Sequence, residues 1–505
     1  MQSLVFENGL GPAPASFNMA GHVLRYADQT PAKAALEILR PDGVQIWTYG
    51  QLAAAVRGTA TGLLRLGLKS GDRVILRLGN SAEFPITYLG CIAVGLIPVP
   101  LSAQLAPPEV SKISANIRPA CTVQSDDIAP ATGQTLSADK LAAFHDLPAA
   151  DFQMGDPDRP AYIIHTSGTS GQARAVVHAH RAVWARQMMW DGWYGLRSDD
   201  RLLHAGAFNW TYTLGTGLMD PWAIGATAVI PSEDCDVATL PALLAQSKAS
   251  IFAAAPGVYR RLLRAEIPAM PHLRHGLSAG EKLPEAVKSA WIKATGTQVH
   301  EAFGMSECST FISGNPLRAT PCGASGFAQA GRRVAIVENG QPVARGVVGT
   351  IAIDRDDMGL MLAYLDAPHD TRAKFNGDWF LTGDLGVMDG EGAITYAGRA
   401  DDMMNAGGFR VSPIEVETAL TAHSGITEVA AAQVQIKPDV HVIAAFYVST
   451  DVIQDADLSA FCAKNLAGYK CPRLFVRVET LPRGANNKLL RRVLRQDWEA
   501  ANGQT

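Results

Sequence analysis

Residues 165–174, HTSGTSGQAR, concentrate small hydroxyl residues and glycines in one short segment. Apolar residues 162–164 precede it and are typical of a strand, so we expect this segment to be a loop at the end of a sheet. Glycines let a backbone approach a ligand closely, and successive N–H groups and hydroxyls can surround phosphate oxygens. Arg174 adds a fixed positive charge. The segment therefore predicts a phosphate-binding loop, with an ordinary flexible surface turn as the alternative.

Other residues able to do chemistry follow this loop, but each has an ordinary structural interpretation when it is taken alone. Ser306 could cap a helix that leaves Glu307 exposed, and Asp384, in the tripeptide TGD, is typical of a plain turn. Lys488 precedes the sequence LLRR and would usually be a surface helix residue. The loop itself departs from the nucleotide-binding pattern GxxxxGK[ST], because QA follows its last glycine.

The segments that must position these residues alternate between strand and helix patterns. Residues 73–78 (RVILRL) are typical of a buried strand, and residues 97–101 predict another. Asn80 or Ser81 is expected to cap the helix between them. Similar alternation over residues 227–255 predicts an α/β fold, in which mixed and parallel sheets are covered by helices.

The pattern changes after about residue 400. Residues 429–435 and 441–448 are apolar-rich and predict strands, and helical segments follow Pro413 and Asp457. The Gly-rich segment 398–408 would suit a hinge. We therefore expect a large domain over residues 1–400 and a small, mobile α+β domain over residues 401–505.

Composition excludes several classes of protein. The chain has 505 residues, 47% hydrophobic and 18% charged, with a net charge of −4, which describes an ordinary globular protein with more than one core. The basic cluster Arg491, Arg492 and Arg495 is interpreted as a solvated helix face, so no nucleic-acid partner is expected. The cysteines lack CxxC spacing, and neither a signal peptide nor a membrane span is evident, so a cytoplasmic protein is predicted.

The loop closely resembles the signature TSGTTGxPKG of the adenylate-forming superfamily, which contains acyl-CoA synthetases, peptide-synthetase adenylation domains and luciferases. Arg174 keeps the basic charge of the signature, whereas Ser170, Ala173 and Ala175 replace its second Thr, its Pro and its last Gly. Five further segments resemble motifs of the superfamily in the right order: SAGE at 278–281, FGMSE at 303–307, TGD at 382–384, GRADD at 398–402 and PRGANNK at 482–488.

The resemblance implies a two-step reaction. A carboxylate attacks the α-phosphorus of ATP to give an acyl-adenylate and pyrophosphate, and a thiol, usually that of coenzyme A, then displaces AMP. Because this attack brings anions together, cations and fixed hydrogen-bond donors must surround the phosphates. The chemistry explains why hydroxyls, a carboxylate for Mg²⁺ and a mobile lysine recur in these motifs.

The resemblance also implies roles for individual residues. Ser306 would contact the α-phosphate, Glu307 would bind Mg²⁺, and the compact ammonium of Lys488 would meet both the attacking carboxylate and the α-phosphate. The remaining positions implied to bind ATP or AMP are Thr166, Ser167, Gly168, Thr169, Ser170, Gly171 and Arg174 at the phosphates, Gly280, Glu281, Glu301 and Phe303 at the adenine, and Asp384 with Arg399 at the ribose.

Three further positions concern the second half-reaction. Asp401 matches the hinge about which the small domain is expected to rotate between the two steps. Gly408 and Arg410 match positions near the coenzyme A tunnel, where Arg410 could meet a phosphate.

A different group of residues indicates which carboxylic acid the enzyme would activate. At the position of Gly304, acetyl-CoA synthetases have a Trp that restricts the pocket, so Gly predicts an acid larger than acetate or propionate. Phe208, Trp210 and Tyr212 match a pocket wall, although they could equally be core residues. Residues 211–225 look most like the medium-chain acyl-CoA synthetases, with benzoate-type ligases as near relatives. The chain is thus expected to be an ATP-dependent ligase that joins a medium-chain or aromatic acid to coenzyme A.

Two other functions remain open from the residues. The protein could be a stand-alone adenylating enzyme that loads a carrier protein, or a non-catalytic relative that binds acyl groups or nucleotide. The non-catalytic alternative is raised by residues that depart from the family motifs, such as Asn486 and Asn487, which replace Ser and Gly beside Lys488. The oligomeric state is also open, with a homodimer as one alternative.

Overall fold

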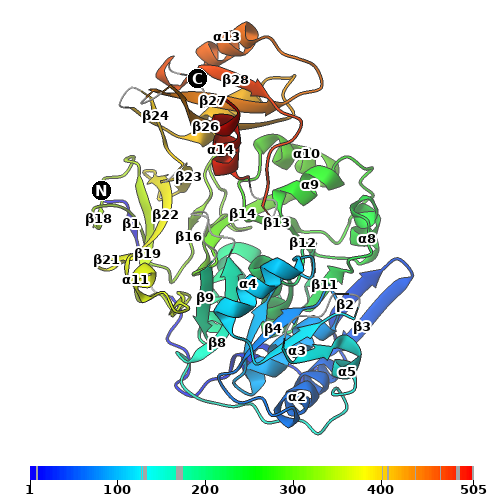
Figure 1. The fold of residues 1–505 in the computed structure, drawn as a ribbon. Helices are drawn as coiled ribbons and strands as arrows, with labels where there is room; N and C mark the ends of the chain where they lie inside the picture. Colours follow the sequence, from blue (N-terminus) through cyan, green and yellow to red (C-terminus); the bar gives the residue numbers. More distant parts are fainter. Residues whose placement is uncertain are drawn as a thin grey trace. The chain divides into compact units, whose positions relative to one another are not determined.

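The computed structural model describes residues 1–6, 9–126, 128, 133–166, 174–400, 402–406, 409–437, 440–466, 468–484 and 489–502. They form two compact units (Figure 1). The larger unit comprises Val5–Arg333 and Asp354–Asp378. The smaller unit comprises Met1–Leu4, Val334–Ile353 and Trp379–Thr505. No helix in the described part of the chain is long and apolar enough to cross a membrane.

The central sheet of the larger unit has the order β16-β15-β14-β13-β12-β10-β11-β2-β3. Six neighbouring strands of this sheet pair in parallel: β14, β13, β12, β10, β11 and β2. At the two edges, β3, β15 and β16 pair antiparallel. Their bounds are β2 Ala34–Arg40, β3 Gly43–Thr48, β10 Arg201–His204, β11 Thr227–Pro231, β12 Ile251–Ala254, β13 His275–Ala279, β14 Gln298–Met305, β15 Ser309–Ser313 and β16 Phe327–Ala328.

The central parallel strands of this sheet are buried on both faces, which explains why they read as apolar runs. Phe252 and Ala254 of β12 pack with α8 (Leu240–Gln246), α9 (Pro256–Leu262) and α10 (Glu285–Thr295). Ile251 and Ala253 point to the opposite face and pack with η1 (Trp190–Tyr194) and the segment before η2 (Thr213–Met219). The alternation follows from the two-residue repeat of a strand.

Two smaller sheets belong to the same unit. A parallel sheet has the order β5-β4-β6-β7, and an antiparallel sheet has the order β20-β9-β8. Their strands are β4 Arg73–Arg77, β5 Ile97–Pro100, β6 Cys121–Gln124, β7 Thr135–Ser137, β8 Pro160–Thr166, β9 Arg174–Ala179 and β20 Ala363–Tyr364. The remaining helices of this unit are α1 Met19–Val23, α2 Tyr49–Arg65, α3 Glu83–Ala93, α4 Pro107–Ile117, α5 Ala138–Ala142, α6 Ala182–Ala185, α7 Asp220–Ile224, η3 Val237–Thr239 and α11 Pro368–Arg372.

The strands and helix predicted over residues 73–101 are present, but the predicted helix cap is wrong. Helix α3 begins after Ala82, and no side chain caps it. Asn80 instead donates to the carbonyls of Gly206 and Pro231 and accepts the N–H of Phe208 at 2.9 Å. Asn80 thus binds backbone groups near residues 206–208 and 231 instead of the start of α3. The same side chain can serve either purpose, and the local sequence does not distinguish them.

The smaller unit also joins sheets and helices. Its strands are β17 Val334–Glu338, β18 Gln341–Pro342, β19 Gly349–Asp354, β22 Trp379–Met388, β23 Ile394–Arg399, β24 Met404–Ala406, β25 Phe409–Val411, β26 Glu428–Lys437, β27 Val440–Val448 and β28 Leu474–Arg477. Its helices are α12 Pro413–Thr421, α13 Asp455–Asn465, η4 Gly468–Lys470 and α14 Arg491–Asn502. Further short strands of the chain are β1 (Leu4–Val5) and β21 (Phe375–Asn376). The predicted α/β class with a smaller α+β part is confirmed.

One surface interpretation is corrected in this unit. Arg491, expected on a solvated helix face, donates to both carboxylate oxygens of Glu417 at 2.8 and 2.7 Å and lies 3.5 Å from Asp402. Burial alone would lower the pKa of Arg491, but Glu417 more than reverses this and raises it. Arg491 therefore ties the start of α14 to α12 and to the segment after β23.

Candidate active site

The predicted phosphate loop joins two antiparallel strands. Strand β8 ends at Thr166 and β9 begins at Arg174, directly opposite each other in the ladder. The Thr166 hydroxyl donates to the carbonyl of Arg174 at 3.3 Å. The loop thus leaves the end of a sheet, as expected. The predicted phosphate contacts Ser167, Gly168, Thr169, Ser170 and Gly171 lie outside the described residues.

The base of this loop is connected to Glu307 through Tyr364. Arg174 forms an ion pair with Asp370, and its guanidinium lies 5.1 Å from the centre of the Tyr364 ring. The hydrogen bond from Arg174 lowers the pKa of Asp370. The Tyr364 hydroxyl in turn donates to Glu307 Oε1 at 2.7 Å. Burial, together with the nearby carboxylate, raises the pKa of Tyr364, so this hydroxyl keeps its proton at neutral pH.

Glu307 and Ser306 lie between β14 and β15, and residues of β9 and of the segment before β20 hold their backbone. The Glu307 side chain is buried, and its carbonyl accepts the N–H of Met361 at 2.7 Å. Nε2 of His178, on β9, lies 2.7 Å from the Ser306 carbonyl. Burial lowers the pKa of His178 to about 4, so the ring is neutral at pH 7 and must donate this bond from Nε2–H. The predicted helix-cap alternative for Ser306 therefore does not apply, because no helix begins here.

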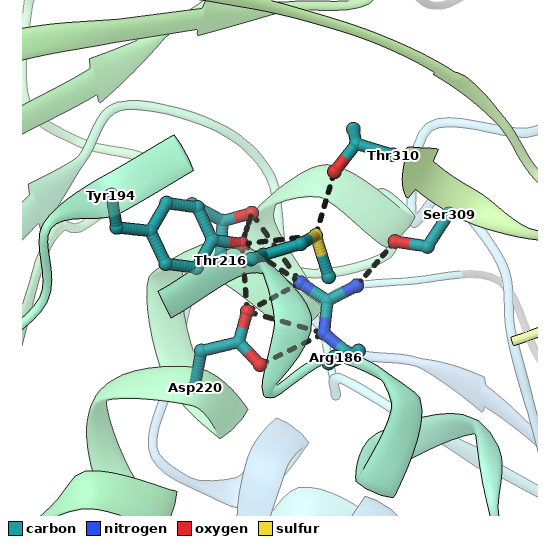
Figure 2. Close-up of polar contacts among 7 residues, drawn as sticks. Arg186, Tyr194, Thr216, Asp220, Ser309 and Thr310 are labelled. Atoms are coloured by element: carbon teal, nitrogen blue, oxygen red, sulfur yellow. Dashed lines mark hydrogen bonds and ion pairs between the residues drawn. The ribbon is translucent and has the colours of Figure 1, made fainter. Parts of the chain in front are cut away.

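A buried polar cluster contacts Ser309 and Thr310, the first residues of β15 after this turn (Figure 2). Arg186 donates from Nε and Nη2 to the Asp220 carboxylate, with contacts of 2.9 and 2.5 Å. The Tyr194 hydroxyl donates to Asp220 Oδ2 at 2.7 Å. Arg186 Nη1 donates to Ser309 Oγ at 2.6 Å, at the first residue of β15. The Thr310 hydroxyl lies 2.6 Å from the Met189 sulfur.

The residues implied to surround the adenine come from β13, β14 and the segments after them. Glu301, on β14, accepts the N–H of Leu283 at 2.8 Å, and burial raises the pKa of its carboxyl. Gly280 has a φ of 97°, and a Cβ there would lie 3.1 Å from the Trp210 ring. Glu281 follows it in the chain. Phe303 lies edge-on to Phe311, with ring centres 5.5 Å apart. The structure therefore brings Trp210 of the proposed acyl wall beside the proposed adenine loop.

The aromatic acyl wall divides into core residues and one more accessible ring. Phe208 is buried against Phe84, with ring centres 5.6 Å apart. Tyr212 is buried, stacks on Trp193 at 5.7 Å, and donates from its hydroxyl to the Leu277 carbonyl at 3.2 Å. Trp210 is only partly buried and meets Tyr212 edge-on at 5.6 Å. Of the three rings, Trp210 is therefore the best placed to contact a ligand.

Gly304 has a backbone reason to be glycine. Strand β14 has a register irregularity between Phe303 and Gly304, and a Cβ at residue 304 would lie 2.2 Å from the Ser309 carbonyl oxygen. Real Cβ atoms do not approach backbone so closely. In this structure β15 leaves no room for a side chain at residue 304, so a larger residue there would require the β14–β15 backbone to move.

The implied ribose contacts come together within the smaller unit. Asp384 on β22 lies opposite Arg399 on β23, and Arg399 Nη1 lies 3.4 Å from Asp384 Oδ1. The Tyr396 hydroxyl lies 3.4 Å from the same oxygen. The tripeptide TGD lies within β22, so the plain turn that it suggested is wrong; Gly383 has a φ of 81° inside the strand. Asp384 and Arg399, predicted from separate motifs, are therefore neighbours, and Tyr396 is an addition that the motifs did not indicate.

The structure describes little of the predicted hinge, coenzyme A and lysine positions. Asp401, Gly408 and Lys488 lie outside the described residues, and only the backbone of Arg410, on β25, is described.

Sequence reasoning also missed three residues of the larger unit: Tyr364, His178 and Arg186. Tyr364 contacts Glu307, His178 contacts Ser306, and Arg186 contacts Ser309 just after them; each comes from a distant part of the chain, and Tyr364 and Glu307 are 57 residues apart. No local pattern marks them, because Tyr and His are ordinary in a protein interior and the partner that allows an Arg to be buried lies far away in the sequence.

Comparison with known proteins defines the class. A model of the AMP-binding enzyme family matches residues 23–365, and a model of the AMP-binding enzyme C-terminal domain matches residues 415–488. The chain therefore belongs to the AMP-binding enzyme family. The resemblance inferred from the motifs, including its acyl-CoA synthetase branch, is confirmed.

Similar proteins include acid–CoA ligases and acyl-coenzyme A synthetases. Benzoate–CoA ligase of Thauera aromatica is 30% identical over 90% of this chain and 91% of the relative. Human mitochondrial acyl-coenzyme A synthetase ACSM2A is 29% identical over 96% of this chain and 92% of the relative. Among solved structures, the anthranilate CoA ligase AuaEII in complex with anthranoyl-AMP has a TM-score of 0.87 at 26% identity, covering 97% of this chain and 99% of that one. ATP-bound MatB of Rhodopseudomonas palustris has a TM-score of 0.86 at 26% identity, covering 96% and 100%.

Proposed function

We propose that this enzyme is an AMP-forming ligase that joins a medium-chain or aromatic carboxylic acid to coenzyme A. The carboxylate oxygen attacks the α-phosphorus of ATP and pyrophosphate leaves. The sulfur of coenzyme A then attacks the acyl carbon and AMP leaves. The observation that carries the proposal is the continuous contact from Arg174, at the base of the phosphate loop, through Tyr364 to Glu307. It joins a cation and a carboxylate, the two charges that a magnesium–phosphate complex requires.

Glu307 fits the magnesium that the family implies. Mg²⁺ prefers oxygen ligands and is commonly held by one or two carboxylates together with substrate phosphates. Glu307 supplies such a carboxylate, and the Tyr364 hydroxyl orients it by engaging one oxygen. Bound magnesium would neutralise phosphate charge. Arg174 is paired with Asp370 in this structure, so engaging the phosphates would mean exchanging that partner.

In the smaller unit, Asp384 is proposed to accept hydrogen bonds from the ribose hydroxyls. Its carboxylate can accept several donors, and Arg399 and Tyr396 each lie 3.4 Å from Oδ1, which orients the carboxylate. Lys488 is proposed to act in adenylation, and Gly408 and Arg410 to contact coenzyme A. These roles follow from the family motifs.

We further propose a mobile domain over residues 401–505 that rotates about Asp401 between the half-reactions. Proline fixes φ, so Asp401→Pro is expected to slow one half-reaction by about 10²-fold while the other continues. Pyrophosphate release and thioester formation from supplied acyl-adenylate would be measured separately. Asp401→Ala removes the carboxylate but leaves the backbone free, and it is expected to retain both steps. Normal rates of both steps in Asp401→Pro would refute the hinge.

The proposed reaction and acid class are tested by one panel. AMP release would be measured with ATP, Mg²⁺, coenzyme A and a series of acids from acetate to dodecanoate, together with benzoate and hydroxybenzoates. We expect turnover of medium-chain or aromatic acids and little with acetate. Benzoate–CoA ligase and the acyl-coenzyme A synthetase among the relatives favour this range. Activity confined to acetate would contradict the acid class.

The same assay separates the alternatives. An enzyme that loads a carrier protein would show ATP–pyrophosphate exchange with an acid but no thioester with free coenzyme A. A non-catalytic relative would show no exchange with any acid. The carboxylates Glu307 and Asp384 and the cation Arg399 are all retained, which favours catalysis.

A further inference from the structure

The turn between β14 and β15 is closed by a residue in an unusual backbone conformation. Met305 pairs with Ser309 across the two strands, and the turn between them carries Ser306 and Glu307. Ser309 has a φ of 63°, in the left-handed region that a non-glycine residue seldom adopts. Such a conformation persists only where surrounding contacts hold it.

The contact that holds Ser309 comes from a guanidinium built into the core. Arg186 and Asp220 are both buried, and Gly215 on η2 makes room for the pair, since a Cβ there would lie 2.3 Å from Arg186 Cζ. Asp220 occupies Nε and Nη2 of Arg186, which directs Nη1 toward Ser309 Oγ (Figure 2). The 2.6 Å bond to Ser309 is thus made by a charged donor whose orientation is fixed on its other side.

We propose that Arg186 is a positioning residue for the nucleotide: through Ser309 it holds the Ser306–Glu307 turn in the geometry that receives magnesium and the phosphates of ATP. The inference rests on the proposed function. Tyr364 fixes one oxygen of the Glu307 side chain, and the Arg186–Ser309 bond fixes the backbone beneath it. If only the Tyr364 contact were present, the Glu307 carboxylate could still shift whenever the backbone of the turn moved.

A purely structural network would behave differently. If the Arg186–Ser309 bond only stabilised the fold, losing it would reduce the fraction of folded protein and leave each folded molecule with normal affinity for Mg·ATP. A positioning role changes the affinity of folded protein for Mg·ATP and leaves the apparent affinity for the acid nearly unchanged.

The test uses the full chain with two substitutions at one position. Ser309→Ala removes the hydroxyl and keeps a side chain at positive φ, whereas Ser309→Gly removes the hydroxyl and relieves the backbone restriction. Ser313→Ala is the matched control: Ser313 is a buried serine of the same strand, and its hydroxyl donates to Gly192 at 2.7 Å, away from the turn. Binding of Mg·ATP would be measured by calorimetry, and KM for ATP and for the acid by pyrophosphate exchange.

Both Ser309 variants are expected to raise the Kd for Mg·ATP by about tenfold, the factor associated with losing one hydrogen bond to a charged donor. The KM for the acid should stay within about twofold, and Ser313→Ala should match the wild type. An unchanged Kd in both variants would overturn the inference, as would a parallel rise in both KM values. A wild type that neither binds Mg·ATP nor exchanges pyrophosphate with any acid would refute the proposed function, and the inference with it. A normal wild type with unaffected variants would refute the inference alone.

Discussion

Lys488→Ala is expected to slow acyl-adenylate formation by about 10²–10³-fold, while thioester formation from supplied acyl-adenylate continues. The ammonium is proposed to meet the attacking carboxylate and the α-phosphate, where negative charge accumulates in the first step only. Without it, two anions approach each other with one fewer cation between them. Pyrophosphate release would report the first step, and coenzyme A thioester formation from synthetic acyl-AMP would report the second.

Lys464→Ala provides the matched control for this result. Lys464 lies in the last turn of α13, is exposed, and belongs to none of the proposed contacts. Both half-reactions should proceed normally in that variant. Pyrophosphate release at the wild-type rate in Lys488→Ala would contradict the proposed role of Lys488, and equal loss of both half-reactions would point to misfolding.

Arg186→Met is expected to lower the free energy of unfolding by about 3–5 kcal/mol, because it leaves the Asp220 carboxylate buried without its cation. Urea unfolding of the full chain would measure the loss. Arg118→Met is the control, because Arg118 pairs with Asp366 on the surface, where such pairs contribute about 0–1 kcal/mol. The double variant Arg186→Met/Asp220→Leu should recover much of the lost stability, since it removes the unpaired charge.

The loss in Arg186→Met should depend on pH. Burial raises the pKa of Asp220, and Arg186 opposes this shift, so removing Arg186 raises the pKa further. A carboxyl with a raised pKa binds its proton more tightly in the folded state than in the unfolded state, so folding stability falls as pH rises toward the folded-state value. The variant should therefore be closest to wild type in mild acid and furthest from it near neutrality. A loss independent of pH, or one no larger than that of Arg118→Met, would show that Asp220 is not left charged and unpaired.

Much of the fold and part of the site could be predicted because their signals are local. The strands around residues 73–78 and 97–101 show as apolar runs, and the end of β8 is followed by the predicted cluster of glycines and hydroxyls, whose phosphate-binding role stays a prediction. The neighbouring positions of Asp384 and Arg399 followed from two short motifs on paired strands. The prediction that Asn80 caps a helix was wrong, because a side chain that can cap a helix can equally hydrogen-bond to backbone groups far away in the sequence.

By itself, the sequence determined the family, the order of the motifs and the chemical types that the reaction needs, since a few residues in sequence carry each of these. Only the tertiary structure decided which side chains support them: Tyr364 on Glu307, His178 on Ser306, and Arg186 on Ser309. These contacts depend on how strands and helices pack at atomic distances, and hydrogen bonds and close backbone approaches between remote segments leave no periodic trace along a chain.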